Sequence, residues 1–375
     1  MWGAKRGAFF ELFNKPKRMN RLILVGNGFD LAHGLKTSYN SFLLHYIKKV
    51  FNHAYKNKYY SDGLIRIHLV DNFYPVGDYA TIDSIVDYFY SQGLHDLFTK
   101  KVYTLPGYNQ YFQNPFQTTI DSLFFKSLLL SCSKYSWVDI ENEYYRHLKQ
   151  ILDSVKDKGD EVKRLNKTLL CLINELEDYL HLLPTVPDLK EYRDIIYSPL
   201  VSSSISAPNK ILVLNFNYTS TFEPYLTKAP INTSINYIHG ELKSLDNPIV
   251  FGFGDEMDLS YLKLESEPTR GFLDYMKAFW YFRTSNYHDL IRFIDSELFE
   301  VFILGHSCGL SDRTMLNMIF EHKNCEHIKI YYYEEKGGKN NFTPLTQEIS
   351  RHFKNKGDMR KKIVPFPQSE CMPQY

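Results

Sequence analysis

Short apolar runs that end in polar or glycine residues occur near the beginning of the chain and again after residue 209. The first is Arg21–Val25, which enters a glycine-rich turn. Four similar runs follow, and each ends in a cluster that contains Asn, His, Asp or Ser: Ile211–Leu214, Ile235–Ile238, Ile249–Phe251 and Val301–Leu304. Such runs are typical of buried parallel strands. The pattern therefore predicts these strands, with Ile328–Tyr333 as a final one.

The stretch between the first run and residue 208 has a different pattern. Thr37 and Ser38 can cap a helix from Tyr39 to about Val50, after which the chain becomes aromatic and mostly helical in pattern. Within it, apolar residues recur in alternating steps of three and four: Val162, Leu165, Leu169, Leu172, Leu176, Tyr179 and Leu183. Such a stripe on one helix needs an apolar partner. We expect another helix of residues 51–208, whereas an exposed stripe would indicate an interface between copies of the chain.

These two patterns together predict the fold. The carboxyl ends of parallel strands meet at one edge of the sheet, where ligands bind in open α/β folds. We therefore predict an α/β protein with a Rossmann-like, mostly parallel sheet and a large helical insertion after the first strand and helix. The core would comprise residues 19–50 and 209–355, and the insertion residues 51–208. Residues 1–18 would form a leader, and residues 356–375 a loose tail.

Composition narrows the classes of partner. Apolar residues make up 44% of the 375 residues, which is globular composition. A net charge of +1 gives no strong signal for a nucleic-acid partner. The five cysteines form no C-x-x-C pair, so we expect neither a metal nor a disulfide framework, and a reducing cytoplasm fits best. No apolar run approaches the ~20 residues of a membrane span, so no membrane partner is expected.

The glycine-rich turn after the first strand is the first candidate binding element. Gly26 and Gly28 allow positive φ angles and let backbone N–H groups approach a phosphate or ribose. We assign these glycines, with Asn27 and Asp30, to nucleotide binding. Leu31 stands where the dinucleotide fingerprint has a third glycine. The alternative is a tight strand-to-helix turn with Asp30 as a helix cap.

The string GNGFDLAHGLKTSY, which contains this turn, resembles the opening signature of the AbiH family of bacterial abortive-infection proteins. Four more strings resemble blocks of the same family: WVDIE, NFNYT, IHG and GHSCGLSD. The resemblance implies a role in phage defence, in which an infected cell stops growing or dies. It also implies a phage protein as a candidate trigger.

Two of these blocks are also similar to sirtuin-like NAD-binding domains. Asn215 and Asn217 stand where those domains have a strand-end Asn block, and His239 stands where they have the catalytic His-Gly. The similarity implies NAD as substrate or ligand, with Asn217 orienting a water or the ribose and His239 as general base. Thr219 replaces the Asp of the block, and the absence of zinc-binding cysteine pairs disfavours protein deacetylation. Alternatively, the asparagines cap the next helix and His239 is a hydrogen-bonded turn residue.

The last strand-end cluster offers a competing chemistry. We assign Gly305, His306, Ser307 and Asp312 to nucleotide binding, because similar Gly-x-Ser strand ends contact ribose in sirtuin-like domains. The spacing of GHSCG also matches the nucleophile elbow of serine hydrolases, although the order of the partner residues does not. A turn of small residues with a capping Ser is the third interpretation.

Two charged groups lie outside these clusters. Asp139, Glu141 and Glu143 open a predicted helix, where acids complement the helix dipole; a second acid or base facing the crevice is the alternative. Lys277 and Arg283 are best explained as a solvated helix face, and phosphate binding is the alternative.

The strand-end clusters predict a nucleotide site, and the similarity to sirtuin-like domains implies that this site hydrolyses the nicotinamide–ribose bond of NAD. A non-catalytic sensor of a nucleotide or phage protein is the first alternative. A serine hydrolase or nuclease that uses the region around Ser307 is the second.

Overall fold

The computed structural model describes residues 19–70, 81–104, 111–135, 139–154, 157–200 and 207–375. By its internal contacts the chain divides into two compact units. Unit 1 comprises the chain up to Leu35, Pro184–Ile249 and Tyr281–Tyr375, and unit 2 comprises Lys36–Leu183 and Val250–Trp280. This division assigns the helix that begins at Tyr39 to unit 2 rather than to the sheet-bearing unit.

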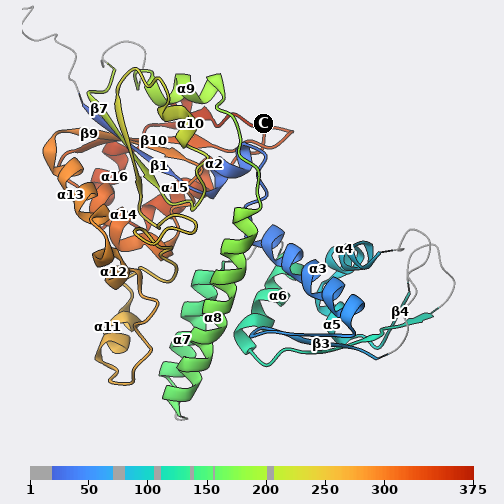
Figure 1. Cartoon of the computed structure of the whole chain (residues 1–375). Helices are drawn as coiled ribbons and strands as arrows, with labels where there is room; N and C mark the ends of the chain where they lie inside the picture. The colour runs from blue at the N-terminus through green and yellow to red at the C-terminus, as the bar shows by residue number, and fades with distance from the viewer. Residues whose placement is uncertain (1–18, 71–80, 105–110, 136–138, 155–156, 201–206) are drawn as a thin grey trace, which may run out of the picture. The chain divides into compact units, whose positions relative to one another are not determined.

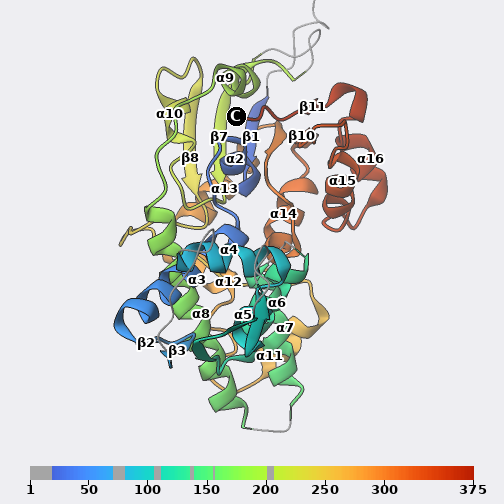
Figure 2. The ribbon, with the colours of Figure 1, turned by 90° about the vertical axis from the view of Figure 1, so that its right-hand side faces the viewer.

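Unit 1 is built on a six-stranded sheet in which every pair of neighbours is parallel. Its strands are β1 (Asn20–Val25), β7 (Lys210–Asn215), β8 (Asn232–Tyr237), β9 (Phe299–Leu304), β10 (Cys325–Tyr332) and β11 (Glu370–Cys371). Across the sheet they run β11-β10-β9-β1-β7-β8, which is the order of Rossmann folds, with the first strand in the middle. Figure 2 shows β8, β7, β1 and β10 following one another from left to right. The predicted Rossmann-like α/β class is therefore confirmed.

The two central strands are completely buried because helices accompany the sheet (Figure 1). The helices of unit 1 are α2 (Asn27–Ala32), α9 (Lys190–Tyr197), α10 (Glu223–Leu226), α13 (Asn286–Ser296), α14 (Arg313–Phe320), α15 (Phe342–Ser350) and α16 (Lys356–Lys362), with short 3-10 turns η3 (Tyr281–Arg283), η4 (Leu310–Asp312) and η5 (Phe366–Gln368). Tyr192 and Ile196 of α9 pack in one apolar cluster with Ile23 of β1, Val213 of β7 and Phe302 of β9. This cluster fixes the central strands from which the candidate site extends.

The strand predicted at Ile249–Phe251 is not present. These residues have no strand conformation, and Phe253 instead forms an isolated bridge with Met276. The apolar run is short and lies between Pro248 and Gly252, which has a φ of 146°. A run this short between a proline and a strained glycine cannot extend into a paired strand.

The tail predicted to be loose is also ordered and packed. Within it, α16 is a helix and β11 pairs with β10. Met372 is buried, and the backbone N–H of Tyr375 donates to the carbonyl of Ala32 at 2.8 Å. Tyr192 donates its hydroxyl proton to the carbonyl of Pro373 at 2.8 Å. The prediction was wrong because two residues of pairing are too few to give a strand pattern in the sequence.

Unit 2 contains the other described helices and two small antiparallel sheets. Its helices are α3 (Tyr39–Asn57), α4 (Ile82–Gln92), α5 (His95–Thr99), α6 (Leu123–Tyr135), α7 (Ile140–Leu152), α8 (Lys158–His181), α11 (Leu259–Ser266) and α12 (Lys277–Trp280). One sheet consists of β2 (Tyr59–Ser61), β3 (Arg66–Leu69) and β6 (Phe116–Thr119), and the other of β4 (Val102–Thr104) and β5 (Tyr111–Gln113). The predicted cap is present, because Ser38 accepts a hydrogen bond from the N–H of Ser41 at 3.1 Å.

The apolar stripe of α8 has its partners inside the chain. All its residues within the helix are buried, and Leu183, which lies beyond the helix end, is half-buried. The helix lies beside α7 over part of its length, as Figure 1 shows, and also contacts α3 and α6. The predicted intramolecular partner is thus confirmed. No helix among the described residues is long and apolar enough to cross a lipid bilayer.

Candidate functional site

The glycine-rich turn after β1 packs directly against the turn after β9. The N–H of Gly28 donates to the carbonyl of Gly305 at 2.9 Å, and that of Gly26 to the carbonyl of Leu304 at 3.1 Å. A Cβ atom on Gly28 would lie 2.8 Å from Cα of Gly305, and one on Gly26 would lie 2.5 Å from Cα of His306. The glycines are therefore required by the close approach of two backbone turns. This approach occurs between β1 and β9, where the strand order reverses direction and where Rossmann folds bind ligands.

Gly305 allows a test of how tightly these turns must pack. Its φ is 73°, and a Cβ atom would lie 2.1 Å from the backbone nitrogen of Phe29. Gly338 has a similar φ of 84° with nothing within 4 Å, so Gly338→Ala is a matched control that carries only the backbone strain, about 1–2 kcal/mol. We expect Gly305→Ala to lower the free energy of unfolding by about 1–3 kcal/mol more than the control does. Urea unfolding of both variants measures the difference, and equal losses would contradict the packing argument.

The loop after β7 is fastened to the turn after β1 by buried hydrogen bonds. The Asn217 side-chain amide donates from Nδ2 to the carbonyl of Gly26 at 3.0 Å, and its backbone N–H donates to Oδ1 of Asn215 at 3.1 Å. Thr219 donates its hydroxyl proton to Oδ2 of Asp30 at 2.6 Å. Neither asparagine caps α10, and Asp30 does not cap α2, whose first residue follows Gly26. Of the predicted residues, the structure thus joins Asn215, Asn217, Asp30 and Gly26 into one network.

Asp30 is almost completely buried, and this burial raises the pKa of its carboxyl group from 3.8 to about 6, against the lowering effect of the hydrogen bond from Thr219. The folded state therefore favours the neutral acid. Relative to the ionised form, protonated Asp30 stabilises the folded state. This contribution is fully present below pH 3.8 and is lost as the pH rises through about 6, so the folded state becomes less stable across this interval.

Asp30→Asn should remove this dependence, because an amide has the same shape and no charge. The stability of the wild-type chain relative to Asp30→Asn is expected to fall by on the order of 3 kcal/mol between about pH 4 and pH 7. Urea unfolding across this range measures it, with Asp246→Asn, a change at an exposed aspartate, as control. Parallel stability curves for wild type and Asp30→Asn would contradict the assignment.

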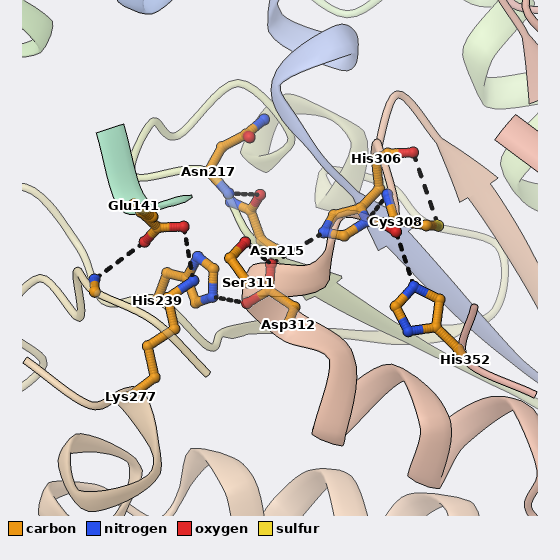
Figure 3. A network of polar contacts seen from close by, with 11 residues as sticks. Glu141, Asn215, Asn217, His239, Lys277, His306, Cys308, Ser311, Asp312 and His352 are labelled. Carbon is orange, nitrogen blue, oxygen red and sulfur yellow. Dashed lines mark hydrogen bonds and ion pairs between the residues drawn. The ribbon is translucent and has the colours of Figure 1, made fainter. Parts of the chain in front are cut away.

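His239 follows β8 and is held by Asp312 of η4. Its Nε2 lies 3.0 Å from Oδ1 of Asp312, and both side chains are buried. The other carboxylate oxygen of Asp312, Oδ2, accepts from the hydroxyl of Ser311 at 3.3 Å and lies 3.9 Å from Nε2 of His306. Figure 3 shows these side chains with the asparagines of the β7 loop. One carboxylate therefore faces two imidazoles at the carboxyl edge of the sheet.

The hydrogen bond to His306 defines the tautomer of this second imidazole. The backbone N–H of Cys308 donates to Nδ1 of His306 at 3.0 Å, so the Nε2 atom of neutral His306 carries the proton. The ring of Phe216 lies against both imidazoles, with ring centroids 4.1 Å from His306 and 5.1 Å from His239. Both imidazoles thus pack on the same aromatic ring.

Two predicted site residues are exposed rather than buried. Asn27 is the first residue of α2, and Ser307 lies in the turn after β9. Among the described residues, no histidine is hydrogen-bonded to Ser307, so the geometry gives this serine no base. The turn continues into Cys308, which has a positive φ of 52° although it is not a glycine. Ser307 thus lies on a strained, exposed turn beside the buried network.

The acidic helix start has structural roles within unit 2. Asp139 caps α7 by accepting from the N–H of Asn142 at 3.0 Å, and Glu143 forms an ion pair with Arg146. Glu141 is buried and accepts from Nζ of Lys277 at 3.0 Å and from the N–H of Gly252 at 3.1 Å. Lys277 has no exposed side-chain surface, so its interpretation as part of a solvated helix face was wrong. Its apolar neighbours in the sequence are the only signal that could have indicated burial.

Sequence reasoning also missed a buried ion pair between two strands of the sheet. Arg21 of β1 and Glu300 of β9 are both inaccessible, and Nη2 of Arg21 lies 2.6 Å from Oε1 of Glu300. Arg21 also donates to the carbonyls of Ile196 at 2.6 Å and Ser198 at 2.7 Å. This pair joins the two central strands to the end of α9.

Three features of the candidate site thus coincide at the carboxyl ends of β1, β7, β8 and β9: the packed glycine turns, the asparagine network and the His239–Asp312 pair. Among the described residues, no group of three or more His, Cys, Asp or Glu side chains has the geometry of a metal site. No curated protein matches the chain. The family model described as "Bacteriophage abortive infection AbiH" matches residues 22–334, so the chain belongs to the AbiH family of abortive-infection proteins.

Proposed function

We propose that this protein binds a nucleotide at the carboxyl edge of its Rossmann-like sheet and hydrolyses the nicotinamide–ribose bond of NAD. Loss of NAD would stop the metabolism of an infected cell, which agrees with the abortive-infection family of the chain. The half-buried Gly28 and the exposed residues Asn27 and Ser307 would contact the nucleotide, whereas the buried Gly26, whose N–H and carbonyl are bonded within the protein, would shape the turn.

The proposed reaction consumes one water and releases one proton. The water oxygen attacks the anomeric carbon of the nicotinamide ribose as the bond from this carbon to the nicotinamide nitrogen breaks. The bonding electrons go to the nicotinamide ring and cancel its positive charge, so the leaving group needs no acid. His239 takes the proton of the water, and Asn217 holds the water or the ribose in line.

The observation that carries the proposal is the position of Asn217 and His239 relative to the reversal of strand order. The two residues follow β7 and β8, which are neighbours in the sheet, and Nδ2 of Asn217 is bonded to the carbonyl of Gly26 in the turn after β1. An imidazole and a side-chain amide therefore lie beside the edge where Rossmann folds bind dinucleotides, which supports the roles proposed for them. His239 is also fixed by Asp312, as expected of a histidine that must present one nitrogen consistently.

The proposal requires that purified protein convert NAD into nicotinamide and ADP-ribose. Chromatography of the products measures this directly, and cells that carry the gene should lose NAD after phage infection. A phage protein is the proposed trigger, so the purified protein is assayed with and without lysate from infected cells. Unchanged NAD in the infected cells and in both assays would refute the activity and favour the non-catalytic sensor.

The region around Ser307 is the basis of the competing hydrolase hypothesis. A fluorophosphonate probe should leave the protein unlabelled under the present proposal, because no histidine among the described residues is bonded to Ser307. Covalent labelling that disappears in Ser307→Ala would instead support a serine hydrolase.

A further inference from the structure

We infer that Asp312 is a positioning residue that fixes the tautomer of His239, and not a nucleotide contact. The inference rests on the proposed function, in which His239 is the base. The sequence pattern assigned Asp312 to ribose binding, but both of its carboxylate oxygens face protein groups. Oδ1 is 3.0 Å from Nε2 of His239, and Oδ2 accepts from Ser311 at 3.3 Å.

The hydrogen bond determines which imidazole nitrogen carries the proton. A carboxylate only accepts hydrogen bonds, so Nε2 of neutral His239 must be the protonated nitrogen. The lone pair is then on Nδ1, which is the basic atom of the tautomer. In the absence of Asp312 the two neutral tautomers would compete, and only one of them presents its lone pair at Nδ1.

The same carboxylate stabilises the charged form that hydrolysis produces. When His239 takes the proton of the water, it becomes an imidazolium beside a buried carboxylate, and this ion pair is strong where water is excluded. His306 faces the same carboxylate, and its Nε2 is also protonated because Nδ1 accepts from Cys308. At 3.9 Å its Nε2 lies beyond hydrogen-bond distance of Oδ2, so His239 is the imidazole that Asp312 orients.

Asp312→Asn tests the inference because it keeps the shape of the side chain while its amide can donate to Nε2 and favour the opposite tautomer. We expect kcat for NAD hydrolysis to fall by about 10²–10⁴-fold. KM should change by less than about threefold, because the residue does not touch the substrate. Asp246→Asn makes the same change at an exposed aspartate and serves as control, with kcat within about threefold of wild type. Circular dichroism verifies that both variants are folded.

Nitrogen-15 NMR of labelled histidines provides a readout that does not depend on activity. The His239 signals, assigned by their loss in His239→Ala, should show a protonated Nε2 in wild type and a shift toward protonated Nδ1 in Asp312→Asn. If the tautomer changes but wild-type protein does not hydrolyse NAD, the positioning role stands and the proposed reaction fails. An unchanged tautomer would overturn the inference, and so would a KM raised at least about tenfold with kcat intact, which would return Asp312 to nucleotide binding.

Discussion

His239→Ala is expected to lower the rate of NAD hydrolysis by about 10²–10⁴-fold, which is the usual effect of removing a general base. Without the imidazole, no group at this position accepts the proton of the attacking water. The fold should persist, because His239 lies in a turn beyond β8 and not in the apolar cluster of the sheet. Nicotinamide release by the purified variant measures the rate, and nucleotide binding measured by calorimetry should remain.

Two further variants separate this mechanism from its competitors. Asn217→Ala should cause a loss of similar size, since it removes the amide that orients the reacting groups. Ser307→Ala should weaken binding and leave measurable turnover, because Ser307 is proposed only to contact the nucleotide. A serine hydrolase would give the reverse order, with Ser307→Ala inactive. If cells with each of the three variants still resist phage fully, the site is not the effector and the sensor hypothesis is preferred.

Arg21→Met is expected to lower the free energy of unfolding by about 3–5 kcal/mol. The change leaves the carboxylate of Glu300 buried without its partner and removes the donor to the carbonyls of Ile196 and Ser198. Unpaired charge in the interior is costly because the protein cannot replace the lost hydration. Urea unfolding followed by circular dichroism measures the loss.

The double variant Arg21→Met/Glu300→Leu should be more stable than Arg21→Met, because it leaves no charge behind. Arg292→Met is the control in the same unit, since the ion pair of Arg292 with Asp289 is exposed and should contribute less than about 1 kcal/mol. Additive losses from Arg21→Met and Glu300→Leu would show that the two side chains act independently, contrary to the structure.

Apart from β11, the strands of unit 1 were predictable because each is a short apolar run that ends in a turn. Arg21–Val25 and Val301–Leu304 differ from β1 and β9 only at their first residues. Because parallel strands end at a common edge, Asn217, His239 and Gly28 were expected at that edge, and the structure brings them there. The residue types at the strand ends and the parallel direction of the strands were sufficient to predict the position of this part of the site.

The partners of these residues could not be predicted in the same way. His239 and Asp312 are 73 positions apart, and their contact depends on how η4 follows the turn after β9. The Arg21–Glu300 pair, 279 positions apart, depends on the register between β1 and β9. The register between two neighbouring strands cannot be read from a single sequence. Lys277 shows the same limit, because the sequence around this lysine does not indicate its buried hydrogen-bond partner, Glu141.

The central place of β1 also determines when the site can exist during synthesis. This strand is made first, yet it pairs with β7, where Arg21 is opposite Ile211, and with β9, where Asn20 is opposite Phe299. Contacts so distant along the chain form slowly, and meanwhile the apolar strand is exposed to aggregation. The turn that contacts Gly28 is translated only after β9. A nascent chain therefore stays without the assembled candidate site until late in translation, so the activity that we propose for this site would be withheld from unfinished copies on the ribosome.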